Sequence, residues 1–482
     1  MEDIVIIGGG ICGCSLLYEL SRYKTKVLLL EKENDIAIGS TKANTAIVHA
    51  GYDPEPNTKM AKYNVLGNAL IQKMCVDLDV LFKRIGSLVV GFDETDRKTI
   101  EKLLEKGIAN GVKGLRIIER DEMFEMEPNL SREALCALYA PSAGIISPWE
   151  LAIAQAECAV KGGAKVQLNA EVKSIKKEKD YFILETSNGE IESKYVINAA
   201  GTSSDLVSQM IEDKFFEIHS KSGEYFLLDT TESGIVNTTV FPCPSALGKG
   251  ILVSPTIHGN VIVGPDSKSV ERGHNECTAA GLAGVKKGAM RLIPNVNVRA
   301  SIRNFAGIRA DAGLEDFIVG ESDKVSGFFN IAAIKSPGLT SAPAIAKDIV
   351  SALKKKKDLK FEANPKFVSK RKVVRFKHLE AKEKETLIKK NPLYGTIICR
   401  CQTITEGEIV DALRRPLPPH SLDAVKRRCS SGMGRCQGGF CGPRVQALIS
   451  RELQIKENDI PLDRADMYII TGKTKNEKEG SL

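Results

Sequence analysis

The sequence predicts a mixed fold, α/β followed by α+β, with a small helical module near the C-terminal end. Three observations predict it. The first residues read as strand, glycine turn, helix and strand, which is a βαβ unit. Strand patterns separated by turn signals follow from about residue 165, which indicates an antiparallel sheet. A compact block rich in cysteine and glycine then follows a basic stretch.

The βαβ unit carries the glycines that a bound dinucleotide requires. Gly8, Gly10 and Gly13 form G-x-G-x-x-G between a strand at residues 3–7 and a helix at residues 11–20. The first glycine allows the sharp turn, the second lets the backbone approach a pyrophosphate, and the third lets the helix and the strand pack closely. The N-terminus of the helix then faces the phosphates.

A second strand, residues 27–30, leads into Glu31, where an acid can accept a hydrogen bond from a ribose hydroxyl. Together these features predict a Rossmann-like domain that binds NAD or FAD. The chain then runs KENDIAIGSTKANTAIVHAGYD, a loop of small residues in place of another regular strand and helix. Such a loop can lie along a flavin ring and carry a catalytic side chain, so we favour FAD.

Two later segments fit the same cofactor. VINAAGTSSD ends a strand in small residues, which leaves room for close approach to a nucleotide. IKSPGLTSAPAIA begins a helix whose N–H groups can face the flavin and stabilise negative charge on its reduced form; plain helix capping after a proline is the alternative. The cofactor-binding residues that we predict are Gly8, Gly10, Gly13, Glu31, Ser40, Thr41, Asn44, Thr45, Gly201, Gly338, Leu339, Thr340 and Ser341.

The remaining patterns between these segments predict a second layer. Residues 51–144 are mostly helical in pattern, with one strand near GSLVVGF. A meander of strands follows, with a turn at Asn188 and Gly189, and further strands are predicted at EYFLLD, GILVSPT and NVIVGPD. The last apolar block, GFFNIAAIKSPGLTSAPAIAKDIVSAL, predicts a strand, a Pro-Gly turn and a helix.

Composition indicates an ordinary globular protein of 482 residues, with 43% hydrophobic and 27% charged residues. No apolar run is long enough to cross a bilayer, and acidic residues precede the first apolar run, so we expect a cytoplasmic protein without a cleaved signal. Twelve cysteines in a chain of this size are expected to be reduced thiols or metal ligands.

The formal charge of +7 is local. Residues 351–390 contain 15 Lys and Arg against 5 Asp and Glu, so the rest of the chain is net acidic. We interpret this stretch as a solvated linker or helix surface; the alternative is a docking face for an acidic redox partner. It has few interleaved aromatic residues and no recognition motif, so we expect no nucleic-acid binding.

The cysteine-rich block predicts an iron–sulfur site. Cys399 and Cys401 are followed by Cys436 and Cys441, and four thiolates satisfy both irons of a 2Fe-2S cluster. A one-residue spacer is shorter than the spacing usual for zinc, which stays an alternative together with an empty redox dithiol. Glycines between the pairs can point N–H groups at sulfur. Cys429 is expected not to be a ligand.

These segments resemble the superfamily of FAD-dependent amine and hydroxy-acid oxidoreductases. Over about the first 350 residues, GSTKANTAIVHAGYD, SGEYFLLD, FAGIRADAG and IKSPGLTS are similar to flavin-linked glycerol-3-phosphate dehydrogenases and, equally, to L-2-hydroxyglutarate dehydrogenases. Oxidation of a secondary alcohol on a flavin needs a base for the hydroxyl proton, and the resemblance implies His49. Arg309 is the anion anchor, since its planar fork suits a phosphate or a carboxylate. Lys249 and His258 are expected in the pocket, with surface positions as the alternative.

Residues 396–452 resemble the bacterioferritin-associated-ferredoxin-like 2Fe-2S domain. The motifs that match are C-x-C, SLDAVKRR and GMGRCQGGFC. The resemblance implies the anaerobic type of glycerol-3-phosphate dehydrogenase, which carries this domain at the same end, and electrons that leave singly to a redox partner subunit or a quinone-linked acceptor. An L-2-hydroxyglutarate or other 2-hydroxy-acid dehydrogenase is the alternative, and a non-catalytic electron-transfer subunit is an alternative of another class. We expect an oligomer or a multi-subunit complex, peripheral to a membrane only through a partner.

The predicted organisation is a Rossmann-like FAD-binding domain interleaved with an antiparallel-sheet substrate domain, then a small helical 2Fe-2S module. The predicted boundaries are 1–355 for the oxidoreductase, with FAD-binding parts at about 1–80, 145–205 and 300–355 and substrate parts at about 81–144 and 206–299; 356–395 for the basic linker; 396–452 for the 2Fe-2S domain; and 453–482 for a tail.

Overall fold

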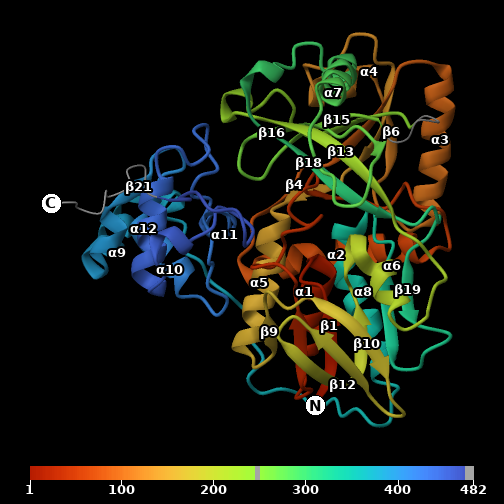
Figure 1. Cartoon of the computed structure of the whole chain (residues 1–482). Coiled ribbons are helices and arrows are strands. Elements are labelled where there is room, and N and C mark those ends of the chain that lie inside the picture. Colours follow the sequence, from red (N-terminus) through yellow and green to blue (C-terminus); the bar gives the residue numbers. More distant parts are fainter. Residues whose placement is uncertain (245–249, 473–482) are drawn as a thin grey trace, which may run out of the picture. The chain divides into compact units, whose positions relative to one another are not determined.

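The structure is a computed structural model, and it describes residues 1–244 and 250–472. The chain divides into a large unit, Met1–Lys32 with Ile36–Lys372, and a small unit, Glu33–Asp35 with Val373–Leu482. The large unit contains two extended sheets flanked by helices, and the small unit is mainly helical (Figure 1). The predicted fold class is confirmed.

The first sheet of the large unit has the nucleotide-binding topology expected from the sequence. Its central strand β1 pairs in parallel with β2 and with β12, and β12 pairs in parallel with β20. Ile4 to Ile7 of β1 are buried, as strands covered on both faces require. The eight strands are β1 (Glu2–Ile7), β2 (Val27–Leu30), β9 (Lys165–Gln167), β10 (Val172–Lys177), β11 (Phe182–Thr186), β12 (Gly189–Asn198), β19 (Ile318–Glu321) and β20 (Phe328–Ala332).

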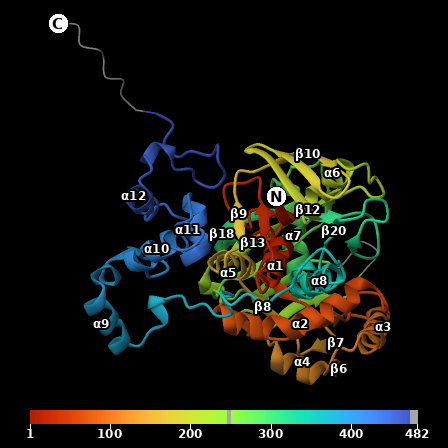
Figure 2. The same ribbon diagram turned by 90° about the horizontal axis from the view of Figure 1, so that it is seen from below.

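Helices cover this sheet and hold its edge in place. α8 packs against α1 and α2, and α1 packs against α5, as Figure 2 shows from below. Gly67 of α2 lies so close to α8 that a Cβ there would overlap the carbonyl oxygen of Thr340. The bounds are α1 (Ile11–Leu20), α2 (Lys59–Leu78), α5 (Pro148–Lys161), α6 (Ser204–Gln209) and α8 (Gly338–Leu353).

The second sheet is antiparallel apart from the β5–β14 pair, and helix α7 packs on β13, β15 and β16. Its apolar core includes Leu88, Val240 and Val263, all fully buried. The nine strands are β5 (Ser87–Gly91), β6 (Arg116–Glu119), β7 (Cys136–Ala140), β13 (His219–Leu228), β14 (Thr239–Pro242), β15 (Leu252–Pro255), β16 (Val261–Gly264), β17 (Lys268–Ser269) and β18 (Ser301–Asp311). The helices that flank it are α3 (Glu94–Ala109), α4 (Arg120–Met126) and α7 (Ala279–Leu292).

A small third sheet carries the chain toward the expected site. Strand β8 (Gly144–Ile146) pairs with both β3 (Ile47–Val48) and β4 (Phe82–Arg84). Strand β3 leads directly into His49. The backbone that carries this histidine is therefore fixed by a strand pair.

The sequence patterns were incomplete in two places. The segment 51–144 contains β4, β6, β7 and β8 in addition to its helices and the predicted β5. These strands have three to five residues each, too short for an alternating pattern to stand out. Strand β18 begins the part at about 300–355 that is predicted to bind FAD, and it pairs with β13 in the second sheet. The predicted turn at Asn188 and Gly189 does join β11 to β12.

The first part of the basic stretch is not the solvated linker that its charge predicts. Asn364 donates hydrogen bonds to the carbonyl oxygens of Ser21 and Gly162, both at 2.9 Å. Arg371 forms a buried ion pair with Glu157 at 3.0 Å. Residues up to Lys372 therefore belong to the large unit, because aromatic and polar side chains among the lysines fix them to it.

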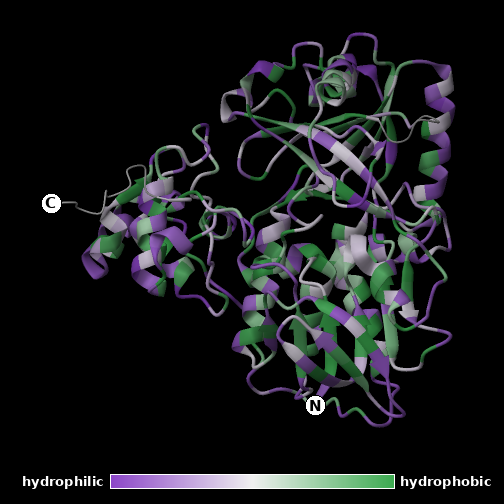
Figure 3. Ribbon diagram, viewed as in Figure 1, coloured by the Kyte–Doolittle hydropathy of each residue, from purple (hydrophilic) through white to green (hydrophobic). Residues whose placement is uncertain are grey.

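The small unit has its own apolar core, which includes Ile409, Val425 and Ile449. Figure 3 shows hydrophilic and hydrophobic residues alternating along its helices, as amphipathic helices require. Thr405 and Glu408 form a capping box at the start of α10. The elements are β21 (Ile397–Cys399), β22 (Ile404–Thr405), α9 (Ala381–Lys390), α10 (Glu406–Leu413), α11 (Leu422–Cys429) and α12 (Gly442–Leu453).

A buried charge network completes the small unit. The carboxylate of Asp35 accepts hydrogen bonds from Arg427 at 2.9 Å and from Arg428 at 2.8 and 2.9 Å. Burial alone would raise the pKa of Asp35, but the charges and hydrogen bonds of the two arginines lower it to about 2. Asp35 therefore stays ionised, and both guanidinium groups are paired although they are buried.

Among the residues that the structure describes, no helix is long and apolar enough to cross a membrane.

Candidate active site and cysteine module

The glycine turn has the close backbone approaches that the sequence predicts. Gly8 has φ +109°, and a Cβ there would lie 2.5 Å from the carbonyl oxygen of Ala199. A Cβ at Gly13 would overlap the carbonyl oxygen of Gly8. Helix α1 has Gly10 as its N-cap, with no side-chain capping bond and no acidic residue in its first turn. This end of the helix is therefore suited to a pyrophosphate.

Other predicted residues surround the same turn. The carboxylate of Glu31 accepts a hydrogen bond from the Gly9 N–H at 2.6 Å. The hydroxyl of Thr41 accepts one from the Ile11 N–H at 2.9 Å, which ties the loop of small residues to the helix start. Gly201, at φ +58°, follows the strand end that faces Gly8. The residues present thus fit the adenosine and pyrophosphate part of FAD.

The loop of small residues is held in shape by its own polar side chains. Asn44 donates to the carbonyl oxygens of Ser40 and Thr41 and accepts from the Ala46 N–H at 2.8 Å. Ser40 donates to the carbonyl oxygen of Ile308 in β18 at 2.6 Å. The loop therefore lies against the second sheet. Thr45, the remaining predicted loop residue, is half-buried.

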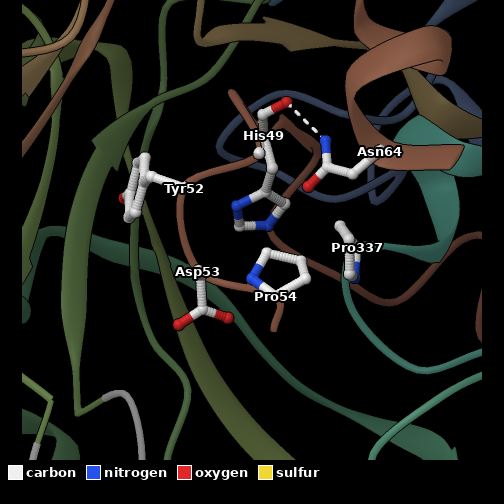
Figure 4. Close-up of a pocket in the computed structure, with 7 residues that line it drawn as sticks. His49, Tyr52, Asp53, Pro54, Asn64 and Pro337 are labelled. Atoms are coloured by element: carbon white, nitrogen blue, oxygen red, sulfur yellow. Dashed lines mark hydrogen bonds between the residues drawn. The ribbon is translucent and has the colours of Figure 1, made fainter. Parts of the chain in front are cut away.

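His49 ends this loop in a pocket of the large unit. Its ring nitrogen Nε2 lies 3.1 Å from the hydroxyl of Ser336. Its main chain is fixed, because its N–H donates to Thr340 and its carbonyl oxygen accepts from Asn64 and Asn68. Figure 4 shows the imidazole among the pocket residues that it labels. The residues that line the pocket are His49, Gly51, Tyr52, Asp53, Pro54, Asn64 and Pro337.

The glycine-leucine-threonine-serine motif begins a helix as predicted, and this start of α8 contacts His49. The hydroxyl of Thr340 accepts the hydrogen bond from the His49 N–H at 2.9 Å, and Ser341 donates to the carbonyl oxygen of Pro337. Gly338 begins the helix and Leu339 follows it; the first turn has no acidic residue. The N-terminal end of this helix therefore lies beside the candidate base.

Arg309 lies on β18, in the sheet that faces the loop. Its guanidinium donates to the carbonyl oxygen of Asp266 at 3.1 Å, and it hydrogen-bonds the hydroxyl of Tyr225. Glycine at position 223 makes room for it, because a Cβ there would overlap the guanidinium nitrogen. A Cβ at Gly307, two residues before Arg309, would overlap the carbonyl oxygen of Ala43. The strand that carries Arg309 is thus in contact with the loop that leads to His49.

Two lysines that the sequence analysis did not select join Arg309. Lys221 is paired with Arg309 across strands β13 and β18, so the two side chains share one face of the sheet. Lys221 forms an ion pair with Asp311 at 2.5 Å, and Lys335 forms another with the same carboxylate at 3.0 Å. Lys335 is adjacent to Ser336, which contacts His49. The dipeptide Lys335-Ser336 therefore links the candidate base to a cluster of cations.

The carboxylate of Asp311 is held ionised. Burial alone would raise its pKa, but hydrogen bonds from Lys221 and Lys335 lower it to about 2. We call Arg309, Lys221, Lys335 and Asp311 the cation cluster. It carries three positive charges and one negative charge near neutral pH.

The two remaining predicted pocket residues are not brought into this arrangement by any described contact. His258 lies in the turn between β15 and β16, where its ring stacks on Trp149 with a centroid distance of 6.3 Å. Lys249 lies outside the residues that the structure describes.

The four predicted ligand cysteines of the small unit come together as two pairs. Cys401 and Cys436 are exposed, with their sulfur atoms 3.6 Å apart. Cys399 and Cys441 are buried and hydrogen-bond one another. Two thiolates on one tetrahedral metal with bonds of about 2.3 Å lie about 3.8 Å apart, so each pair suits one iron. No group of three or more His, Cys, Asp or Glu side chains in the described ranges surrounds a single metal position.

Backbone N–H groups point at the sulfurs, as the glycines in this block predict. A hydrogen bond from Cys441, together with N–H groups that include that of Gly432, lowers the pKa of Cys399 to about 6. The N–H groups of Phe440 and Gly438 lower the pKa of Cys436. These donors stabilise thiolates, so the residues fit a 2Fe-2S cluster. Cys429 instead donates to the carbonyl oxygen of Val425 at 3.3 Å.

A nucleotide-binding sheet, a loop that carries a histidine and a second sheet above it define a flavin-dependent oxidoreductase. The model of the family "FAD dependent oxidoreductase" matches residues 3–352, so the chain belongs to this family. The model "BFD-like [2Fe-2S] binding domain" matches residues 397–451. The resemblances stated from the sequence, and the two cofactors that they imply, are therefore confirmed.

Known proteins agree with this assignment. The chain is 45% identical to "Glycerol 3-phosphate dehydrogenase" of Caloramator mitchellensis, over 99% of this chain and 100% of the relative. It is 27% identical to the human mitochondrial "L-2-hydroxyglutarate dehydrogenase", over 74% of this chain and 89% of the relative. The solved structure "Dithionite reduced L-alpha-Glycerophosphate Oxidase from Mycoplasma pneumoniae with FAD bound" is similar with a TM-score of 0.73 and 30% identity. The alignment covers 77% of this chain and 98% of the chain in that solved structure.

A Gly13→Ala variant is expected to lose flavin. The added methyl group overlaps the Gly8 carbonyl oxygen, and relieving the overlap must open the turn that holds the pyrophosphate. We expect flavin affinity to fall about tenfold, since overpacking typically costs about 1–3 kcal/mol. Flavin released from the purified, folded variant measures the loss. Gly284→Ala on α7 is the control, because a Cβ there meets nothing within 4 Å and the helix lies on the second sheet. Equal flavin content in both variants would contradict the account.

Proposed function

We propose that the protein oxidises sn-glycerol 3-phosphate to dihydroxyacetone phosphate and delivers the electrons singly to a partner acceptor. One observation carries the choice of substrate, namely the cation cluster beside His49. The Caloramator mitchellensis relative, similar along its full length, supports the same choice. When bound, FAD supplies the hydride acceptor and the 2Fe-2S cluster supplies a one-electron carrier.

His49 is the base in this proposal. The hydroxyl of Ser336 lies 3.1 Å from Nε2, which shows that an alcohol can approach this nitrogen at hydrogen-bonding distance. With its proton on Nδ1, the imidazole accepts the proton of the substrate hydroxyl at Nε2 as the carbon gives up its hydride. The substrate hydroxyl takes the place of the Ser336 hydroxyl at Nε2, and the helix start at Gly338 lies next to the ring.

The cation cluster binds the phosphate group. A phosphate monoester concentrates a charge of about −1.5 to −2 on one group at neutral pH, and the cluster offers a net charge of about two of the opposite sign. Arg309 offers a planar fork, while Lys221 and Lys335 offer point charges that Asp311 keeps in place. Because Lys335 precedes Ser336, a substrate held by its phosphate has its alcohol carbon near His49.

The C-terminal module supports a dehydrogenase in preference to an oxidase. The Mycoplasma pneumoniae oxidase structure aligns over 98% of its own length but over only 77% of this chain. The Caloramator mitchellensis dehydrogenase covers 99% of this chain. We infer that the acceptor is a redox partner subunit or a quinone-linked protein, and that any attachment to a membrane is through that partner.

L-2-hydroxyglutarate is the second candidate substrate, and the human relative supports it. This molecule has two carboxylates, one on the carbon that bears the hydroxyl and one at the far end. A cluster of cations at one place suits it less well than it suits a phosphate. Anaerobic bleaching of the bound flavin by each substrate separates the two. Rapid bleaching with glycerol 3-phosphate alone is expected, whereas bleaching with the hydroxy acid alone would overturn the proposal.

A Lys221→Gln variant is expected to raise KM for glycerol 3-phosphate about tenfold with a smaller change in kcat. The lost contact is a charged hydrogen bond to the phosphate, worth about 1.5 kcal/mol or more, and it lies away from the reacting carbon. Steady-state kinetics with an artificial acceptor measures both constants. Lys173→Gln removes a charge from an exposed position of β10 and serves as the control. An unchanged KM in Lys221→Gln would remove this lysine from the phosphate site.

A further inference from the structure

The exposed pair of cysteines is surrounded by an unusual surface. Phe440, between Cys436 and Cys441, has 46% of its surface exposed. The guanidinium of Arg400 lies over its ring at 4.7 Å from the centroid, and that of Arg444 at 5.2 Å. The Phe440 N–H donates to the sulfur of Cys436, so this aromatic residue is directly joined to a cluster ligand.

The two segments that carry the ligand cysteines have charges of one sign. The two segments that bear the four cysteines, residues 399–405 and 430–444, contain three arginines and no acidic residue. Arg400, Arg435 and Arg444 are all exposed, as are Cys401 and Cys436. We call these five residues together with Phe440 the Phe440 face.

We propose that the Phe440 face is the docking site of an acidic protein that accepts one electron per encounter. The proposal rests on the proposed exit of electrons through the 2Fe-2S cluster. In each encounter the reduced cluster loses one electron and the acceptor gains one, so two encounters clear the pair taken from one substrate molecule. Cys401 and Cys436 are exposed, so a cluster bound by them would be accessible to an acceptor at the protein surface.

Charge and residue type both point to this occupant. Aromatic and arginine side chains are enriched at protein interfaces and carry much of their binding energy. A patch of positive charge steers an acidic partner and raises its association rate by one to three orders of magnitude at low salt. Redox encounters bury little area, so one exposed ring with a rim of charge is sufficient.

A competing explanation is that the arginines only balance the negative charge of the bound cluster. In that case their removal shifts the midpoint potential of the cluster and leaves the salt dependence of electron transfer unchanged. The two explanations therefore differ in what a charge-removing variant does.

The test uses the full-length protein loaded with both cofactors and reduced either by glycerol 3-phosphate or by dithionite. The probe is cytochrome b5, an acidic haem acceptor, and cytochrome c is the basic counterpart. Stopped-flow absorbance of the haem gives the second-order rate at several salt concentrations. The first variant is the double substitution Arg400→Gln with Arg444→Gln. The second is Phe440→Ala, which keeps the backbone N–H that donates to Cys436. Lys382→Gln with Lys390→Gln on α9 is the control with the same charge removed.

We expect the double arginine variant to reduce cytochrome b5 at least about tenfold more slowly at low salt, with a weaker salt dependence. Phe440→Ala is expected to slow the reaction and leave the salt dependence unchanged, while the lysine control behaves as the unaltered protein does. Bleaching of the flavin by substrate is expected to be unchanged in all of them.

Several results would overturn the proposal. The first is an unchanged rate of cytochrome b5 reduction in the arginine variant, and the second is an equal loss of this rate in the lysine control. The third is a loss of rate that the shift in the midpoint potential of the cluster explains. The fourth is faster reduction of basic cytochrome c than of cytochrome b5. Binding to vesicles of anionic lipid that the arginine variant abolishes, with cytochrome b5 unaffected, would assign the face to a membrane surface instead. Failure of glycerol 3-phosphate to bleach the flavin, with normal kinetics after dithionite reduction, would refute the proposed substrate and not the docking face.

Discussion

A His49→Ala variant is expected to bleach its flavin with glycerol 3-phosphate about 10²–10⁴-fold more slowly than the unaltered protein, because positioned general bases contribute accelerations of this size. The Ser336 hydroxyl lies 3.1 Å from Nε2 of His49, so this nitrogen is accessible to an alcohol. The methyl side chain of alanine cannot accept the proton. Anaerobic stopped-flow absorbance of the flavin measures the rate without contribution from any later electron acceptor.

The site is expected to survive this substitution, which makes the result interpretable. The main-chain groups of His49, not its ring, hold the loop through Thr340, Asn64 and Asn68. Flavin content and thermal unfolding are therefore expected to be unchanged. His274→Ala is the matched control, since its ring is exposed and lies 3.9 Å from the carboxylate of Glu271. A His49→Ala protein with undiminished flavin bleaching would show that another group takes the proton, and it would revive a non-catalytic role for this pocket.

A Cys436→Ser variant is expected to lose the 2Fe-2S cluster and with it the reduction of one-electron acceptor proteins. Cys436 supplies one of the four sulfurs, and the N–H groups of Phe440 and Gly438 are directed at it. A serine oxygen is a poor substitute for thiolate at iron. Iron and acid-labile sulfide measure the cluster, and reduction of cytochrome b5 measures the exit of electrons.

The reduction of the flavin by substrate can be measured separately from the exit of electrons through the cluster. We expect Cys436→Ser to bleach its flavin with glycerol 3-phosphate at the normal rate, since the residues that bind substrate belong to the large unit. Cys429→Ser is expected to keep both the cluster and the turnover, because the Cys429 thiol bonds to the Val425 carbonyl and not to the other sulfurs. Normal turnover with cytochrome b5 in a cluster-free Cys436→Ser protein would mean that electrons leave by another route.

Local sequence was sufficient to predict the elements whose characteristic pattern lies within one short segment. The glycine turn, the helix at Ile11–Leu20 and the strand at Val27–Leu30 were predicted at their observed bounds. The same holds for the C-x-C motif and its distant partners, because ligand spacing is itself the signal. The helix start at Gly338 was also predicted from its sequence, whereas its contact with His49 came from the structure.

The rest of the site depends on pairing between segments that are distant in sequence. Lys221 directly precedes the motif SGEYFLLD, yet only the register of β13 against β18 places it beside Arg309. Ser336 and Lys335 precede the predicted helix start, and their roles come from contacts with His49 and Asp311. A lysine or serine alone has no pattern that marks it. The only sequence signal for Lys221 was a basic residue directly before the motif SGEYFLLD, and this signal is weak.

The charge of the basic stretch was misleading for a physical reason. Composition reports the sign of a segment but not whether its aromatic and amide groups find partners, and Asn364 and Phe367 both do. Apart from the start of the basic linker, the predicted domain boundaries stay predictions, as do the oligomeric state and the final acceptor.

The most direct test of the account is an anaerobic reaction of the loaded protein with glycerol 3-phosphate, followed by absorbance and by freeze-quench electron paramagnetic resonance. The account predicts that the flavin band bleaches first and that the signal of a reduced 2Fe-2S cluster then grows at a rate that keeps pace with turnover. Bleaching that leaves the cluster oxidised throughout turnover, or no bleaching with this substrate and rapid bleaching with L-2-hydroxyglutarate, would contradict it.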